Sequence, residues 1–230
     1  MIDIHCHILP GIDDGPKDVK TALKMAKIAV KDGIEIIIAT PHCYDGVFDC
    51  QSYDIIALCA EFNELLNQQK INLMVLPGAE IRLVPELIQL VDEGETVVLG
   101  GFVSTLLLEL PEIFIPHVVE NTISMLCRRG VRCIIAHPER NSLILSKNEL
   151  ITGMVFAGAE LQISGGSLLG DFGLKAKFFA QRLLCSSGCC YLASDGHNIK
   201  KRKPVLAKAV KNASKIIGND AAKRLVAGFD

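Results

Sequence analysis

Short apolar runs alternate with longer segments of helical pattern from one end of the chain to the other, and this alternation constrains the fold most. Each run has the length and the Ile, Leu and Val content of a strand that is buried on both faces. The predicted strands are Ile2–His5, Ile34–Ala39, Leu73–Leu76, Thr105–Leu108, Val131–Ala136, Ala159–Ile163 and Tyr191–Ala193. The predicted helices are Lys17–Lys31, Ser52–Gln69, Pro85–Val91, Pro116–Arg129, Lys147–Ala157, Leu174–Ser187 and Pro204–Ala213.

Alternation of strands and helices predicts an α/β fold with parallel strands and right-handed crossovers. About seven such units favour a closed or nearly closed barrel over an open sheet. A TIM barrel usually has about 250 residues, whereas this chain has 230. We therefore expect a compact, irregular relative of that barrel. The sequence has no repeat or Pro/Gly-rich linker, which favours a single domain over residues 1–230.

Charge and hydropathy exclude several classes of partner. The chain has 24 Lys and Arg against 26 Asp and Glu, so its net charge of -2 gives no support for nucleic-acid binding. The basic run Lys200-Lys201-Arg202-Lys203 is short and lies beside a candidate site, where it can serve a local anion. We expect a soluble, cytoplasmic protein without membrane insertion, because the sequence opens without a secretory signal and has no apolar run of membrane-spanning length.

Cysteine chemistry is disfavoured although the chain has nine cysteines. Their number is odd and their positions are scattered, so we interpret them as reduced thiols. No Cys-x-x-Cys pair is present, and the adjacent Cys189 and Cys190 are poorly spaced for tetrahedral zinc. No cysteine has an arginine six positions later, so the Cys-x5-Arg loop of cysteine-dependent phosphatases is absent.

Ionisable residues follow the predicted strands at the point where each strand ends. Because the carboxyl ends of parallel barrel strands lie on one face, we expect these side chains to converge there. The residues are His5 and His7, His42, Glu80, Glu109, His137, and Asp195 with His197. The sequence therefore predicts a site at this end of the barrel.

Histidines and carboxylates in this arrangement are typical of a metal centre. His5 and His7 stand at i and i+2, so an extended backbone directs both rings to one side and Cys6 to the other. Together with Asp14 beside Asp13, the set offers more ligands than one ion uses, and two or three ions are expected. A lone histidine at a strand end is usually an ordinary polar residue, and His117 is placed in that class. Five of the six histidines lie at predicted strand ends, however, which favours the metal centre.

Five motifs occur in order along the chain: Ile-Asp-Ile-His-Cys-His, Thr-Pro-His, Gly-Ala-Glu, Ala-His-Pro-Glu-Arg and Ser-Asp-Gly-His. With them the sequence resembles the polymerase-and-histidinol-phosphatase (PHP) family over almost its whole length. The segment from His5 to Pro16, Glu109 and the segment from His137 to Arg140 are most similar to the bacterial tyrosine-protein phosphatases of capsular and exopolysaccharide synthesis. The resemblance implies a distorted (β/α)7 barrel with a trinuclear site, usually of manganese, with iron, zinc or magnesium as alternatives.

The resemblance also implies a role for each matching residue. His5, His7, Glu80 and Asp195 would hold one ion; Glu80, Glu109 and His137 a second; and Asp14, His42 and His197 the third. Arg140 and Arg202 match positions that clasp phosphate, a task suited to the planar guanidinium fork. The chain departs from the family pattern at Gly196, where a bulkier residue is expected, in the lysine-rich surroundings of Arg202, and in residues 43–48, which lack the basic residues of the family's rim loop.

The expected reaction is hydrolysis of phosphotyrosine by in-line attack of a metal-bridging hydroxide, with Asp13 or Glu139 as candidates to orient histidine ligands. The implied partner is a phosphotyrosine-bearing protein, the tail of a bacterial tyrosine kinase that controls polysaccharide synthesis; self-association stays open. Three alternatives remain: a histidinol-phosphate phosphatase of the same family, a non-catalytic metal-binding PHP domain, and a metal-dependent hydrolase of amides or phosphodiesters.

Overall fold

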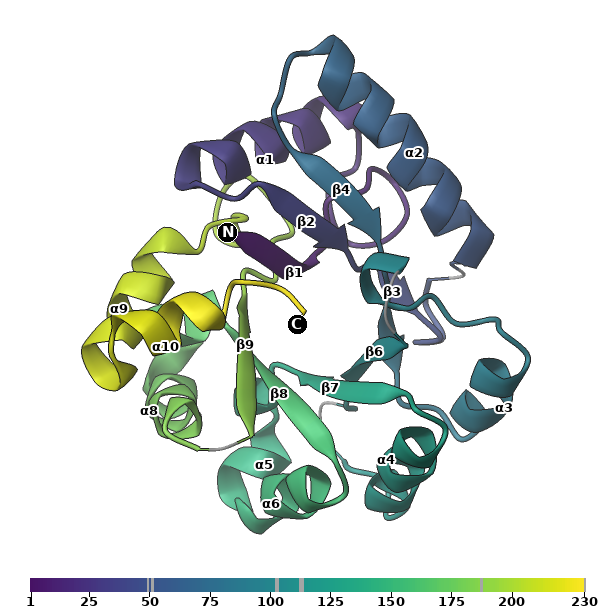
Figure 1. Cartoon of the computed structure of the whole chain (residues 1–230), viewed down its shortest axis with the longest axis vertical. Helices are drawn as coiled ribbons and strands as arrows, with labels where there is room; N and C mark the ends of the chain where they lie inside the picture. Colours follow the sequence, from purple (N-terminus) through teal and green to yellow (C-terminus); the bar gives the residue numbers. More distant parts are fainter. Residues whose placement is uncertain (49, 51, 102–103, 112–113, 187, 230) are drawn as a thin grey trace.

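The computed structural model describes residues 1–48, 50, 52–101, 104–111, 114–186 and 188–229. Parallel strands form a ring, and the helices surround it on the outside (Figure 1). The strands are β1 (Ile2–Cys6), β2 (Ile36–Ala39), β3 (His42–Cys43), β4 (Met74–Pro77), β5 (Glu80–Arg82), β6 (Thr105–Glu109), β7 (Arg132–Ala136), β8 (Ala159–Ser164) and β9 (Cys189–Ala193). Each of the seven predicted strands is present, with ends that differ by one or two residues.

Two barrel strands are each divided into two short pieces, which the sequence did not predict. β3 continues the path of β2, and β5 continues that of β4, because β2 pairs with β4 and β3 pairs with β5, both in parallel. Pro41, in the first break, has no N–H to donate to a ladder. At the second break, a Cβ on Gly78 would lie 2.7 Å from Ile38 Cγ2, so only glycine fits there. The sheets β1-β2-β4 and β3-β5-β6-β7-β8-β9 thus follow each other around one ring.

The ring closes between β1 and the segment after β9. The N–H of Asp195 donates to the carbonyl of His5 at 2.9 Å, and the N–H of His7 donates to the carbonyl of Gly196 at 2.9 Å. Among the described residues this gives seven strand positions, with β2/β3 and β4/β5 counted once each. The fold is the distorted (β/α)7 barrel that the resemblance implied.

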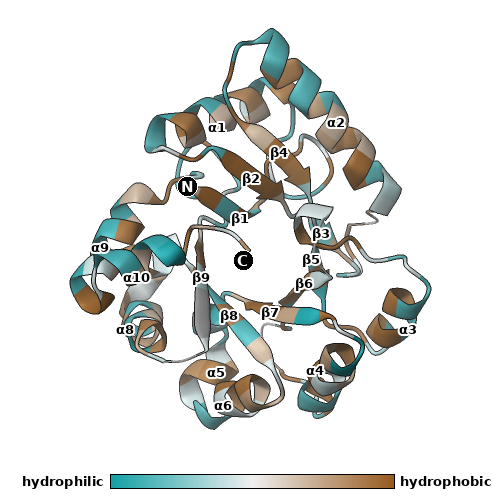
Figure 2. Cartoon of the chain, viewed as in Figure 1, coloured by the Kyte–Doolittle hydropathy of each residue, from teal (hydrophilic) through white to brown (hydrophobic). Residues whose placement is uncertain are grey.

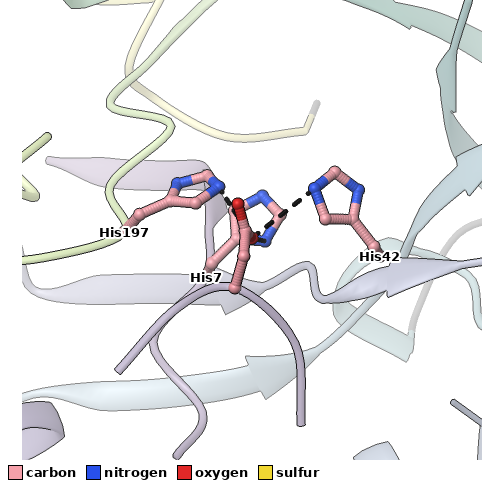
Figure 3. Close-up of side chains that lie close together, drawn as sticks. His7, His42 and His197 are labelled. Carbon is pink, nitrogen blue, oxygen red and sulfur yellow. Dashed lines mark ion pairs between the residues drawn. The ribbon is translucent and has the colours of Figure 1, made fainter. Parts of the chain in front are cut away.

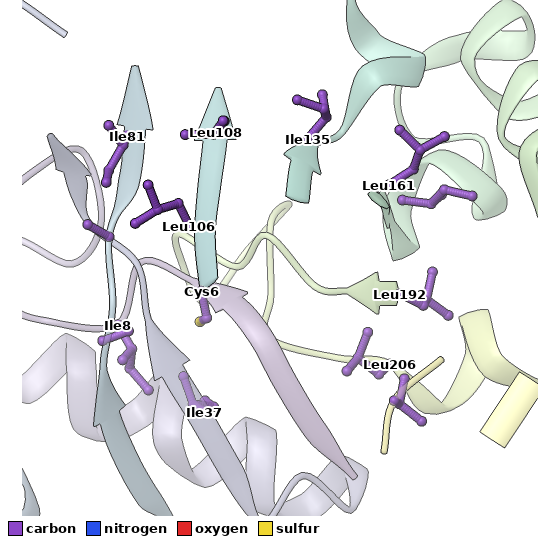
Figure 4. Packing of buried hydrophobic residues seen from close by; sticks show 14 of the residues in the cluster. Cys6, Ile8, Ile37, Ile81, Leu106, Leu108, Ile135, Leu161, Leu192 and Leu206 are labelled. Carbon is purple, nitrogen blue, oxygen red and sulfur yellow. The ribbon is translucent and has the colours of Figure 1, made fainter. Parts of the chain in front are cut away.

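Apolar side chains form one layer inside the barrel and one between the strands and the helices. Along β6, Leu107 belongs to the inner cluster, whereas its neighbours Leu106 and Leu108 belong to the outer one, as the two-residue period of a strand requires. Figure 4 shows Leu106 and Leu108 in the outer cluster. Phe229 of the C-terminal segment packs against Tyr191 of β9, with ring centroids 5.6 Å apart. Figure 2 shows strongly hydrophobic stretches in β2, β4 and β7 and mixed polar and apolar helices around the ring.

The helices cover the outside of the barrel. They are α1 (Val19–Asp32), α2 (Ser52–Gln68), α3 (Leu87–Asp92), α4 (Val119–Arg128), α5 (Ser142–Ser146), α6 (Glu149–Phe156), α7 (Gly165–Leu169), α8 (Gly173–Leu184), α9 (Ala207–Ile217) and α10 (Asn219–Arg224), with short 3-10 turns η1 (Leu99–Gly101) and η2 (Pro138–Arg140). The seven predicted helices are present, but α5, α7 and α10 were not predicted. The predicted end Ser187 lies outside the described residues. No helix in the described ranges is long and apolar enough to cross a membrane.

The caps of α1 show how local sequence fixes these elements. The Asp18 carboxylate accepts from the N–H of Thr21 at 2.7 Å, and Gly33 ends the helix at a φ of 90°. The helix begins at Val19, five residues after Asp14, so residues 7–18 form a short loop at the carboxyl end of β1.

Candidate metal centre

All nine predicted ligands lie at the carboxyl ends of the barrel strands. His5 belongs to β1, His42 begins β3, Glu80 begins β5 and Glu109 ends β6. His7, Asp14, His137, Asp195 and His197 lie in the loops that directly follow β1, β7 and β9. Eight of these side chains are buried or nearly so, whereas the side chain of Asp14 is 47% exposed. The structure therefore gathers residues from most of the chain at one face.

His5, His7 and Glu80 form the most deeply buried group. The Nε2 atoms of the two histidines lie 3.2 Å apart, and Glu80 Oε2 lies 3.3 Å from each of them. The fourth residue of the implied set, Asp195, brings Oδ1 to 3.5 Å from His5 Nε2. Two imidazole nitrogens and two carboxylate oxygens thus point at one small volume.

A second group joins His7, Asp14, His42 and His197, and Figure 3 shows the three rings around a carboxylate. Asp14 Oδ1 lies 3.2 Å from His197 Nε2 and 3.6 Å from His42 Nε2. The ring centroids of His7 and His197 are 3.7 Å apart. His7 therefore borders both groups, whereas the resemblance placed it in the first alone.

The third group is His42, Glu80 and Glu109, whereas the resemblance placed Glu80 and Glu109 with His137. His42 Nδ1 lies 3.2 Å from Glu80 Oε2 and 3.8 Å from Glu109 Oε2. His137 Nε2 contacts the other oxygen of Glu80, Oε1, at 2.8 Å. The two oxygens of Glu80 point in different directions, so this carboxylate separates His137 from His42.

Buried atoms without a hydrogen bond mark the centre of this site. In the described part of the chain they include His42 Nδ1, Glu80 Oε2, Asp195 Oδ1 and His197 Nε2. Burial of a polar atom without a partner is costly, and a bound cation would remove that cost. Imidazole nitrogens with carboxylate oxygens suit Mn²⁺, Fe²⁺ and Zn²⁺. The residues present therefore fit divalent cations.

Buried groups of opposite charge shift one another's pKa. Burial acts to lower the pKa of His7, but hydrogen bonds to Asp13 and Glu80 raise it to about 10. Burial opposes ionisation of Glu80, yet His5 and His137 hold its pKa well below the usual range. Burial and the charge of Glu80 raise the pKa of Glu109 to about 7. Without a cation, the site thus contains strongly coupled protons and charges.

Two residues behind the ligands hold histidine rings in place. Asp13 Oδ2 lies 2.6 Å from His7 Nδ1 and accepts from the N–H of His42 at 3.2 Å, so Asp13 orients a histidine as predicted. Gln162 Oε1 lies 2.9 Å from His5 Nδ1 and accepts from the N–H of His137 at 3.3 Å. The sequence reasoning missed Gln162, although a polar residue inside an apolar strand was a usable signal.

Glu139, the other candidate to orient a ligand, has a different role. Its Oε1 accepts from the N–H of Ser164 at 3.0 Å, at the beginning of α7. The carboxyl is fully buried, and burial raises its pKa to about 7. Glu139 thus links η2 to α7 instead of holding a histidine.

Arg140 and Arg202 meet at one carboxylate oxygen. Arg140 Nη1 and Arg202 Nη2 both donate to Asp195 Oδ2, the second of these at 2.6 Å. Asp195 Oδ1 faces His5, so one carboxylate joins the arginines to the ligand cluster. The Arg140 guanidinium also lies 4.5 Å from the centre of the Phe172 ring, which fixes its orientation.

A pocket of about 270 Å³ opens beside the cluster and is lined by Glu109, His137, Arg140 and Asn141, among others. Arg82, which the sequence reasoning did not single out, contacts Glu109 Oε2 at 3.0 Å. His117 is exposed and belongs to no ligand group among the described residues. The seven cysteines whose side chains are described are free thiols, and only Cys185 is exposed.

Comparison with known proteins gives consistent matches over the whole chain. Residues 1–228 match the family described as capsular polysaccharide synthesis, CpsB/CapC. The chain is 40% identical to the tyrosine-protein phosphatase YwqE of Bacillus subtilis (strain 168) over 202 residues, which are 88% of this chain and 79% of YwqE. It is 26% identical to the tyrosine-protein phosphatase CpsB of Streptococcus pneumoniae, covering 98% of this chain and 94% of CpsB.

Solved structures agree with these sequence matches. Crystal structures of YwqE from Bacillus subtilis and CpsB from Streptococcus pneumoniae are described as those of unique metal-dependent tyrosine phosphatases. The chain matched in that work has a TM-score of 0.93 and is 37% identical in sequence. The match covers 97% of this chain and 90% of the solved chain. A lactonase from Listeria monocytogenes matches with a TM-score of 0.52 at 12% identity, over 99% of this chain and 95% of the lactonase, which is a likeness of fold alone.

Proposed function

The chain belongs to the CpsB/CapC family of capsular polysaccharide synthesis proteins, and on this premise we propose that it is a metal-dependent protein-tyrosine phosphatase. The reaction is hydrolysis of a phosphoric monoester, the phosphate of a tyrosine side chain. The observation that carries the proposal is the position of Asp195. One of its oxygens faces the histidine cluster and the other accepts from two arginines, so cation site and phosphate clasp adjoin.

Divalent cations held by the nine ligands would supply a hydroxide at neutral pH and neutralise the phosphoryl oxygens. The protein's own contribution is orientation. Asp13 and Gln162 fix the rings of His7 and His5, so that their Nε2 atoms stay directed at the centre. Arg140 and Arg202 retain further N–H groups that can donate to the equatorial phosphoryl oxygens. A phenol has a pKa of about 10, so the leaving phenolate does not require a dedicated general acid.

The finer features of the proposal concern metal, substrate and location. We propose manganese as the resident cation and two or three ions in the cluster, because the ligand set is rich in imidazole and carboxylate. The proposed substrate is a phosphotyrosine-bearing protein, the tail of a bacterial tyrosine kinase that controls capsular or exopolysaccharide synthesis. A cytoplasmic location would bring enzyme and kinase tail together.

Release of phosphate from a phosphotyrosyl peptide tests the proposal directly. The purified protein should release phosphate when Mn²⁺ is added and should stop after chelation by EDTA, with activity restored by excess Mn²⁺. Histidinol phosphate, assayed in parallel, should be turned over far more slowly. Activity that survives complete removal of metal would overturn the metal-dependent mechanism, and preferred turnover of histidinol phosphate would overturn the assigned substrate.

A further inference from the structure

A second and larger pocket, of about 520 Å³, lies between α7 and the loop that follows β9. The side chains Leu169, Phe172 and Val205 contribute apolar surface to it. Four consecutive basic residues, Lys200 to Lys203 in the chain, line the same pocket, with Asp171 as the acidic residue among the lining. The pocket thus combines an apolar surface with an excess of positive charge.

The lysines of this pocket have no ion partner among the described residues. Lys200, Lys201 and Lys203 are exposed, and none of the ion pairs found in the described ranges includes them. The loop that carries them is nevertheless ordered by hydrogen bonds. Asn198 Oδ1 accepts from the N–H groups of Lys200 and Lys201, both at 3.0 Å, and the carbonyl of Arg202 accepts from the N–H of His197 at 2.8 Å. The backbone that carries the three lysines is therefore fixed beside the pocket, and their exposed ammonium groups remain available to an anion.

This basic pocket shares residues with the phosphate clasp. Arg202 lines the pocket and also donates to Asp195 in the candidate site. Phe172 lines the basic pocket, and its ring contacts the guanidinium of Arg140. Arg140 in turn lines the smaller pocket, next to Glu109. A substrate whose phosphate lies at the two arginines therefore has neighbouring residues within reach, because an extended chain spans about 3.3–3.6 Å per residue.

We propose that the basic pocket binds a second anionic side chain of the phosphoprotein substrate, a carboxylate or a second phosphate, a few residues from the phosphotyrosine. This proposal rests on the phosphatase function proposed above, and it predicts that the enzyme prefers phosphotyrosines with a second anionic residue nearby. The three lysines attract and pair with the anion, and the apolar surface of Leu169, Phe172 and Val205 accommodates the stem or ring that carries it. Charge pairs at such a rim act on encounter and binding rather than on the chemical step.

The test compares three phosphotyrosyl peptides of equal length in the Mn²⁺-loaded enzyme. One has glutamine on both sides of the phosphotyrosine, one has glutamate there, and one has a second phosphotyrosine. Each is assayed with the wild type, with the variant K200Q/K201Q/K203Q and with the control K24Q/K27Q/K31Q, which removes the same charge from the exposed face of α1. p-Nitrophenyl phosphate, which carries no second anionic side chain for the three lysines, reports the basal activity.

In the wild type we expect kcat/KM for the anionic peptides to exceed that for the neutral peptide about three- to tenfold at low salt. The anionic peptides should have the lower KM, whereas kcat should be similar for all three peptides. The pocket variant should lose this preference, whereas the control should keep it, and added salt should weaken it. The better anionic peptide identifies carboxylate or phosphate as the ligand. If both the wild type and the pocket variant hydrolyse p-nitrophenyl phosphate and show the same preference for anionic peptides, the proposal is overturned. Failure of every substrate, by contrast, overturns the proposed phosphatase function itself.

Discussion

His7 Nδ1 and Asp13 Oδ2 lie 2.6 Å apart, which makes Asp13 the residue that sets the tautomer and orientation of His7. Removal of a carboxylate that holds a metal-binding histidine typically lowers metal affinity about 10–100-fold. We expect that loss in the variant Asp13→Ala, together with lower activity at limiting Mn²⁺. Isothermal titration of the cation-free protein with Mn²⁺ measures it. Asp92→Ala, which removes an exposed carboxylate paired with Arg129, is the matched control and should bind Mn²⁺ as the wild type does.

Binding of a cation should also release a proton from the imidazole of His7. Although burial acts to lower it, Asp13 and Glu80 raise the pKa of His7 to about 10 in the cation-free protein, so the ring is protonated at pH 7. A cation that binds Nε2 must displace that proton, and affinity should therefore rise with pH up to about 10. Titrations at pH 7 in two buffers of different ionisation enthalpy should give different apparent enthalpies. Identical enthalpies would show that no proton leaves and would contradict the assigned pKa.

Arg140 and Arg202 donate to the same carboxylate oxygen, so each is expected to contribute to phosphate binding. Lysine keeps the charge but lacks the planar fork, and at position 140 it also loses the stacking on Phe172. We expect kcat/KM for a phosphotyrosyl peptide to fall about 10–100-fold in Arg140→Lys and in Arg202→Lys. Mn²⁺ content should stay at the wild-type level. A fall in activity that merely tracks lost metal would contradict a direct role in phosphate binding.

Buried parallel strands are continuous apolar runs, and for this reason the barrel could be predicted from the sequence. The short strands β3 and β5 could not be predicted, because they have only two and three residues and begin with the polar ligands His42 and Glu80. The convergence of the ligand residues followed from strand polarity. Their grouping did not follow, because it depends on the directions of the two Glu80 oxygens, which only side-chain packing determines.

The buried thiol of Cys6 lies between two predicted ligands but should have no catalytic role. Its side chain is fully buried, its Sγ donates to the carbonyl of Gly196 at 3.4 Å, and burial raises the pKa of the thiol well above its usual value. We expect Cys6→Ser to keep kcat/KM within about twofold while losing about 1 kcal/mol or more of unfolding free energy. His5→Ala, by comparison, should remove turnover and bound Mn²⁺. Lost turnover in a normally folded Cys6→Ser protein would reopen cysteine chemistry.

The resemblance predicts a bulkier residue at position 196, and the surroundings of Gly196 show why this chain requires glycine. A Cβ there would lie 2.9 Å from the Cα and N of Pro204, which are backbone atoms that cannot move aside as a side chain can. The carbonyl of Gly196 also accepts from the N–H of His7 where the barrel closes. Gly196→Ala must therefore shift either Pro204 or the segment that carries Asp195 and His197.

We expect this substitution to lower the free energy of unfolding by about 1–3 kcal/mol, as overpacking typically does. It should also weaken Mn²⁺ binding, because the closure segment supplies two ligands. Urea unfolding with and without Mn²⁺ separates the two effects: the loss should be larger with Mn²⁺ than without, since weaker binding reduces the stabilisation that the cation gives. An equal loss under both conditions would mean that the segment tolerates the shift without moving its ligands.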